Sequence, residues 1–234
     1  MKNAPILCTA HRGIWDDTIP QNTVESIARA YAHGAEWVET DFNEEPDGAI
    51  LCYHDSGVRA TIKPPFHVPT LKEIIGLVPA DRGLQCEIKK YGPTYAEKFD
   101  EAVRSAGLGP DNITVSSFSD EALSDFHRRF PRYRAIYLFC AGGKSADDLV
   151  SLAKAEDFWS LCPGCETLRG KWTPADADKI REAGLDFRVW GVNSPESLAL
   201  AAEFGAAAFT CNFYETAFDW AATLGIPLRP KVGS

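Results

Sequence analysis

The chain of 234 residues lacks any uninterrupted apolar run of roughly 18 residues, the length that a membrane-spanning helix needs. Its first ten residues carry one lysine and a short apolar run, without the charged region, long apolar core and cleavage site of a signal peptide. We therefore expect a soluble, cytoplasmic protein without stable membrane insertion, whose first strand covers residues 6–10.

Positive charge is also scarce, since 24 Lys and Arg face 33 Asp and Glu, for a net charge of -9. Nucleic acids and anionic membrane surfaces require a basic footprint, so the composition argues against both as partners. A small substrate that carries a phosphate would have to be bound by local cations or by a metal ion.

Nucleotide-binding loops and a disulfide framework are absent as well. The chain contains no GxGxxG or Walker motif. Its seven cysteines are an odd number and lie mostly in apolar segments, which is typical of reduced core thiols. Cys162 and Cys165 form a CxxC pair, but no second pair with metal spacing accompanies it, so a structural role is favoured and their function stays open.

Short β-rich apolar runs alternate with amphipathic stretches along the whole chain, as in parallel βα units. This alternation predicts one (β/α)8 TIM barrel domain over residues 1–234. The predicted strands cover residues 6–10, 37–42, 84–88, 113–116, 134–138, 158–161, 187–190 and 207–210. The predicted helices cover residues 23–32, 95–106, 120–129, 146–155, 174–183 and 196–204.

An extra apolar segment, residues 49–53, follows Asp47-Gly48. Asp-Gly strongly favours a hairpin turn, so this segment should fold back as an accessory strand beside residues 37–42. Such a hairpin would place His54 at the rim of the barrel.

Carboxylates cluster at two predicted strand ends. Glu39 and Asp41 are two residues apart and so share one side of their strand, and Glu87 and Lys89 repeat this spacing on the next barrel strand. Three carboxylates form a hard oxygen site suited to one Mg²⁺ or Ca²⁺ ion. The alternative is that they are salt-bridged charges at the rim.

Two histidines complete the set of chemically capable residues. His11-Arg12-Gly13 ends the first strand, where the Arg12 fork matches phosphate oxygens, and His54 follows the accessory strand. Two histidines beside a bound phosphate can serve as general acid and general base.

Ten short motifs give the chain a more specific likeness. The sequence resembles the glycerophosphodiester phosphodiesterase family, within the superfamily of phosphatidylinositol-phospholipase-C-like phosphodiesterases. The motifs, in the family's order, are His11-Arg12-Gly13, Pro20-Gln21-Asn22-Thr23, Gly34-Ala35-Glu36, Glu39-x-Asp41, Asp47-Gly48, His54-Asp55, Pro69-Thr70-Leu71, Glu87-Ile88-Lys89, Ser116-Ser117-Phe118 and Val189-Trp190-Gly191-Val192-Asn193.

The resemblance implies catalysis by His11 and His54 on a small phosphodiester. It implies one divalent cation on Glu39, Asp41 and Glu87, and attack on phosphorus by a neighbouring hydroxyl of the substrate, which gives a cyclic phosphate. It also implies that Arg12 and Lys89 bind the phosphate. Trp190 is a candidate for the pocket wall on a separate ground, because it ends a predicted barrel strand.

The chain departs from the family pattern at three places. Gln21 replaces a glutamate, and Thr210-Cys211-Asn212 replaces a Thr-Asp pair. The insertion that usually covers the site is reduced to residues 56–68. The shortened insertion leaves the identity of the alcohol groups on the substrate open.

Several alternatives remain at this level. The sequence is also similar to sphingomyelinase D-like phospholipases and to phosphodiesterases of agrocinopine-type opines. Two further alternatives would share only the fold: a barrel that binds a ligand without turnover, and a metal-dependent aldolase or isomerase. The oligomeric state is undetermined. Outside the site, we expect His33 to cap a helix and His127 to be solvated, while Trp15, Trp172 and Glu166 are weaker candidates for the pocket wall.

Overall fold

The computed structural model describes residues 4–140, 142–170 and 172–233. In this part of the chain, eight parallel strands form a closed barrel, and β3 (Ile50–Cys52) lies beside it as a ninth strand. The predicted (β/α)8 barrel is therefore confirmed. The barrel strands are β1 (Leu7–His11), β2 (Trp37–Glu44), β4 (Gly83–Lys90), β5 (Ile113–Ser117), β6 (Arg134–Phe139), β7 (Ser160–Pro163), β8 (Asp186–Val189) and β9 (Ala208–Cys211).

The barrel closes on β1, which pairs in parallel with β2 on one side and with β9 on the other. Thr9 is the partner of both Trp37 and Thr210 across these two ladders. Because all the barrel strands run in the same direction, their carboxyl ends meet at one rim, which is where barrel enzymes carry their functional side chains.

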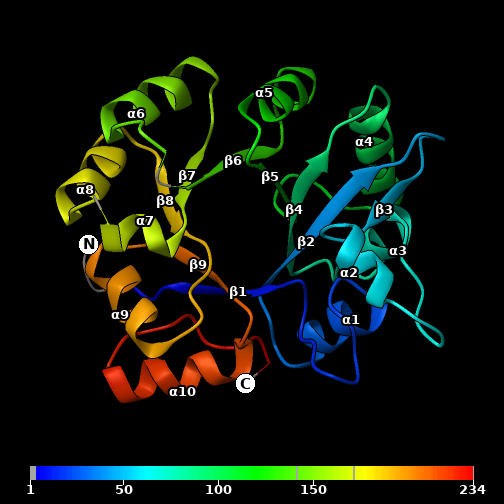
Figure 1. Ribbon diagram of the computed structural model, residues 1–234, viewed down its shortest axis with the longest axis horizontal. Coiled ribbons are helices and arrows are strands. Elements are labelled where there is room, and N and C mark those ends of the chain that lie inside the picture. Colours follow the sequence, from blue (N-terminus) through cyan, green and yellow to red (C-terminus); the bar gives the residue numbers. More distant parts are fainter. Residues whose placement is uncertain (1–3, 141, 171, 234) are drawn as a thin grey trace.

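Helices surround the strands (Figure 1). Several begin with a Thr or Ser capping box, as at Thr23, Ser145 and Ser194. None of the helices in the described ranges has the length and hydropathy that crossing a membrane requires. The helices are α1 (Val24–Ala32), α2 (Ser56–Thr61), α3 (Leu71–Ile75), α4 (Tyr95–Ser105), α5 (Asp120–Arg129), α6 (Ala146–Ala155), α7 (Cys165–Gly170), α8 (Pro174–Glu182), α9 (Pro195–Glu203) and α10 (Tyr214–Leu224).

The accessory hairpin is present as predicted. β3 pairs antiparallel with the end of β2, with Cys52 opposite Phe42 and Ile50 opposite Glu44. Gly48 turns the chain with a φ of 81°, a conformation that favours glycine. This hairpin brings residue 54 back toward the end of β2.

Four helices were not anticipated from the sequence. α2, α3 and α7 span only five or six residues, too few for a helical repeat of apolar positions to be recognised. α10 is longer, but two of its three buried residues are alanines, which give a weak hydrophobic pattern. The shortened segment 56–68 thus contains a helical turn, α2.

The larger hydrophobic core lies between the barrel strands and the helices, and includes the buried rings of Phe42, Phe99 and Phe126. A much smaller apolar cluster consists of Ile136, Leu138 and Cys162. Since Ile136 and Leu138 alternate along β6 with residues that pack in the larger core, this small cluster lies inside the barrel.

One prediction about a histidine was wrong. His127 was expected to be solvated, but it is buried on α5, and its Nδ1 lies 3.1 Å from the main-chain oxygen of Tyr133. The Arg-rich sequence around it suggested a solvated face, whereas the imidazole fills the junction between α5 and the start of β6. His33 does cap a helix, because it is the C-cap of α1.

Candidate active site

Three carboxylates meet where β2 and β4 run side by side. Asp41 is the register partner of Glu87, and Glu39 lies two residues before Asp41 on the same side of β2. One oxygen from each of the three lies within 4.8 Å of the others, and all three side chains are buried. The structure thus brings together the three residues that the sequence predicts as metal ligands.

These carboxylates repel one another because they are buried close together. Burial and the charge of Asp41 raise the pKa of Glu39 well above its ordinary value, and raise that of Glu87 to about 8. Among the described residues, Glu39 Oε2 and Asp41 Oδ1 have no hydrogen-bond partner. Buried oxygens without donors, held within a few ångströms, fit a hard divalent cation such as Mg²⁺ or Ca²⁺.

Two cationic side chains flank the cluster. Lys89 Nζ lies 3.0 Å from Glu87 Oε1 and 4.0 Å from Asp41 Oδ1. Arg12 Nε lies 3.0 Å from Asp41 Oδ2, and Arg12 Nη1 donates to Gln21 Oε1 at 2.6 Å. Both predicted phosphate ligands therefore lie directly beside the carboxylates.

The turn after β1 is built to place Arg12. Its φ of 62° is in the left-handed region, which few residues other than glycine adopt, and Gly13 follows with a φ of 82°. A Cβ on Gly13 would lie 2.4 Å from the main chain of Ser26, so only glycine allows α1 to approach this closely.

Asn22 is a supporting residue to which the sequence reasoning assigned no role. Its Nδ2 donates to Asp41 Oδ2 at 2.8 Å, and its Oδ1 accepts from the backbone N–H of Asp41 at 3.3 Å. These two bonds fix the orientation of the Asp41 carboxylate. The only sequence signal was its position in the motif Pro20-Gln21-Asn22-Thr23.

His11 projects from the end of β1 over Glu39, with its Nε2 3.7 Å from Glu39 Oε2. Its Nδ1 lies 2.5 Å from Asn212 Oδ1, so the amide oxygen accepts a proton held on Nδ1 and leaves Nε2 unprotonated. Burial and the nearby Arg12 charge lower the pKa of His11 to about 4. Near neutral pH this imidazole is a proton acceptor.

His54 reaches the same rim from the accessory hairpin. The residue before it, Tyr53, donates its backbone N–H to Asp41 O at 3.0 Å, and its carbonyl accepts from Asn43 Nδ2 at 2.6 Å. His54 Nδ1 lies 2.6 Å from Asp55 Oδ2, and the other Asp55 oxygen caps the N-terminus of α2. The hairpin and α2 together hold this histidine beside the metal-ligand candidates.

Both histidines line one cavity of about 160 Å³ together with Trp190. The Trp190 Nε1–H donates to the main-chain oxygen of Phe139 at 3.2 Å, and its ring meets Phe118 edge-on at 5.4 Å. The full lining is His11, Arg12, Glu39, His54, Gln85, Glu87, Phe118, Leu138, Trp190 and Thr210.

The weaker candidates lie elsewhere. Glu166 on α7 is exposed and paired with Arg169, outside this cavity. Trp15 donates to the main-chain oxygen of His11 at 3.1 Å, and Trp172 lines a neighbouring cavity. Burial raises the pKa of the Cys162 and Cys165 thiols, and neither belongs to a potential metal cluster within the described residues.

The comparisons with known proteins agree with the resemblance that the sequence predicts. Residues 11–64 match the glycerophosphoryl diester phosphodiesterase family. A segment of 46 residues is 39% identical to glycerophosphodiester phosphodiesterase GDPD6 of Arabidopsis thaliana, and covers 20% of this chain and 12% of that relative. The chain thus spans about an eighth of that relative's length.

Solved structures match along nearly the whole chain. A glycerophosphodiester phosphodiesterase from Parabacteroides distasonis has a TM-score of 0.79 at 21% identity, covering 95% of this chain and 99% of that one. An Oleispira antarctica phosphodiesterase, in complex with its product sn-glycerol-3-phosphate, has a TM-score of 0.77 at 19% identity, covering 92% and 96%. The resemblance to the family and the barrel fold are thereby confirmed.

Proposed function

We propose that this protein is a metal-dependent phosphodiesterase that cleaves a glycerophosphodiester or a related small phosphodiester. The observation that carries the proposal is one cavity lined by two histidines, an arginine and the carboxylates of Glu39 and Glu87, with Asp41 and Lys89 directly beside these carboxylates. The product named for the Oleispira antarctica phosphodiesterase supports a substrate that contains a glycerol phosphate.

Glu39, Asp41 and Glu87 would hold one divalent cation, Mg²⁺ or Ca²⁺. The unpaired oxygens of Glu39 and Asp41 and the raised pKa values of Glu39 and Glu87 support this assignment, because a cation offsets the repulsion among the three. When bound, the ion polarises the phosphoryl oxygens and screens the negative charge of the carboxylates.

His11 is the general base of the first step. Its unprotonated Nε2 removes the proton from the substrate hydroxyl next to the ester, and the hydroxyl oxygen forms a bond to phosphorus. Asn212 keeps the second nitrogen protonated and so holds the ring in the tautomer that this step needs. The lowered pKa of His11 keeps the free base populated near pH 7.

His54 is the general acid. It protonates the oxygen of the departing alcohol as the bond from that oxygen to phosphorus breaks, and the products are the alcohol and a cyclic phosphate. Asp55, 2.6 Å from His54 Nδ1, stabilises the protonated ring before transfer. Water opens the cyclic phosphate when the two histidines exchange roles.

Arg12 and Lys89 bind the phosphoryl oxygens. Arg12 lines the cavity beside Asp41, and Lys89 lies 3.0 Å from Glu87, so both cations can offset charge that grows on the oxygens in the transition state. Donors that are held in place before reaction lower the barrier more than mobile ones, and the turn at Gly13 fixes Arg12 in this way.

The experiment is a panel of phosphodiesters incubated with metal-loaded and chelator-treated protein, read by phosphorus NMR. We expect cleavage of glycerophosphodiesters with metal present, loss of cleavage after chelation, and recovery on adding Mg²⁺ or Ca²⁺. Full activity after removal of metal would refute the role of the carboxylates. Rapid cleavage of diesters that lack a neighbouring hydroxyl would refute internal attack, and no cleavage of any diester would indicate a binding barrel.

A further inference from the structure

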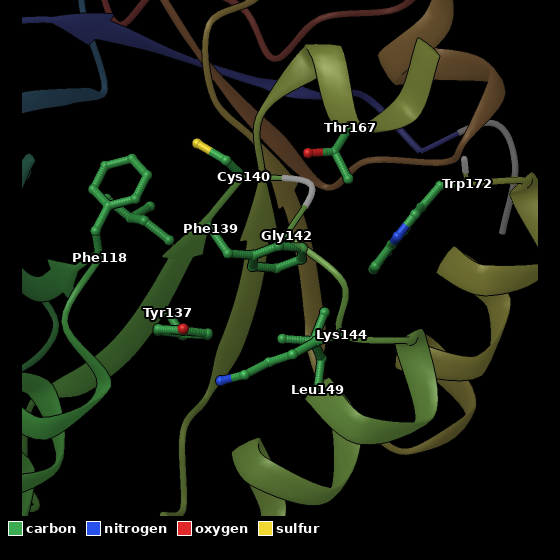
Figure 2. A pocket seen from close by; sticks show the side chains of 10 residues that line it. Phe118, Tyr137, Phe139, Cys140, Gly142, Lys144, Leu149, Thr167 and Trp172 are labelled. Carbon is green, nitrogen blue, oxygen red and sulfur yellow. The ribbon is translucent and has the colours of Figure 1, made fainter. Parts of the chain in front are cut away.

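A second cavity, of about 250 Å³, shares two lining residues with the candidate active site. Figure 2 shows the side chains that line this second cavity. It lies at the carboxyl end of β6, where Phe139 from the strand faces Leu149 from α6 and Thr167 from α7. Phe118 and Leu138 line both this cavity and the one that contains the histidines. The two cavities are therefore adjacent, with Phe118 and Leu138 common to both.

Aromatic rings dominate its lining. Phe118, Tyr137, Phe139 and Trp172 each contribute a ring, and those of Phe139 and Trp172 are 5.5 Å apart. Phe118, at the junction of the two cavities, is 40% exposed, which is unusual for a large apolar side chain in this protein. Exposed aromatic surface next to a reaction site suits an apolar part of a ligand.

The charges around the rings argue against a cationic ligand. Among the described lining residues, Lys144 carries the only charge, and its Nζ lies 5.7 Å from the Tyr137 ring centre and 3.6 Å from Asp120 Oδ2. Lys89 Nζ lies 5.7 Å from the ring centre of Phe118. Two of the four rings therefore already have an ammonium group over them, so these rings are not free to form an aromatic cage around a quaternary ammonium such as choline.

We propose that this cavity binds one alcohol half of the phosphodiester, and that this alcohol is uncharged with an alkyl or aromatic body. The inference rests on the proposed function, because it places the phosphate in the neighbouring cavity between His11 and His54. The proposal specifies the alcohol group of the substrate, which the residues around the carboxylates do not determine.

The test on the unmodified, metal-loaded protein uses glycerophospho esters of methanol, propanol, hexanol, benzyl alcohol and choline. We expect kcat/KM to rise about fourfold for each buried methylene until the cavity is full. The choline ester should be cleaved at least about tenfold less efficiently than the hexyl ester. Equal cleavage of all esters, or preference for choline, overturns the subsite while the proposed function stands. Cleavage of none overturns the proposed function itself.

Two variants locate the effect. Trp172→Ala should reduce the ratio of hexyl to methyl kcat/KM about tenfold, because it removes one wall of the cavity. Lys144→Gln should reduce the difference in kcat/KM between the choline and hexyl esters. The control is Trp220→Ala on α10, a tryptophan that lines neither cavity. If Trp172→Ala and Trp220→Ala keep the same chain-length dependence, the subsite is wrong; if Trp172→Ala does not fold, the ester series on the unmodified protein decides.

Discussion

The two halves of the barrel rim have opposite chemistry. Over β2 and β4 the inward-facing residues include Glu39, Asp41 and Glu87, which are charged and buried. Over β6 and β7 the inward-facing residues are Leu138 and Cys162, which are apolar. The carboxylates of the charged half repel one another, and a bound cation would reduce that repulsion. The apolar half needs no ligand for its stability, and it contributes apolar surface that a ligand can contact.

The largest loss of activity is expected from a substitution of His11, on the charged side of the rim. His11→Ala should lower kcat by about 10²–10⁴ at saturating metal, because the general base is lost. His33→Ala is the matched control, since His33 pairs with Glu215 at the end of α1 and lines neither cavity. Activity is measured by phosphorus NMR on a glycerophosphodiester; equal rates for the two variants would contradict the mechanism.

Metal binding should change stability only through the charged half. Mg²⁺ or Ca²⁺ at about 100 times its Kd should add about 2.7 kcal/mol, or about 5–10 °C in Tm for a chain of this size. Glu87→Gln should abolish most of this gain and raise the Tm of the chelated protein, because glutamine is neutral without taking up the proton that a buried Glu87 must retain. Calorimetry on Glu166→Gln, which alters an exposed carboxylate outside the cavity, should match the unmodified protein.

The stability of the metal-free protein should fall as pH rises. Burial and Asp41 raise the pKa of Glu87 from its ordinary 4.5 to about 8 in the folded state. Between these values the unfolded chain has released a proton that the folded chain retains, so stability decreases through this window and levels off above it. Urea unfolding at a series of pH values should show this slope, and Glu87→Gln should flatten it. A slope that survives in Glu87→Gln would place the effect on another group.

A smaller effect is expected at Asn212. Asn212→Asp places a negative charge against His11 Nδ1 and should raise the pKa of that ring, which burial and Arg12 hold at about 4. More His11 is then protonated in acid, so the acid limb of kcat/KM should shift to higher pH by about 1 unit or more. Asn112→Asp, before β5 at the opposite rim, should leave the profile in place. An unchanged profile for Asn212→Asp would contradict the tautomer assigned to His11.

Local sequence patterns made much of the fold and of the candidate site predictable. Glu39 and Asp41 share a side because strand residues alternate, and Asp47-Gly48 predicts the hairpin that returns to His54. The predicted range of α5, residues 120–129, coincides with the helix. The short helices α2, α3 and α7 were not predicted, because one and a half turns are too few to show a helical repeat of apolar residues.

Other features depend on which distant segments meet. The second cavity combines residues from β6, α6 and α7 with Phe118, and no spacing in the sequence relates them. The burial of His127 likewise depends on packing against the segment before β6. The Arg-rich sequence around His127 gives no sign of this contact.

The sequence by itself determined the alternation of strands and helices, the shared side of Glu39 and Asp41, and the motifs of the family, because each arises from neighbours along the backbone. Only the tertiary structure decided that Asp41 aligns with Glu87 and that Asn212 meets His11 across 201 positions. Those contacts follow from strand register and from the closure of β9 against β1, and both are set by how the whole barrel packs.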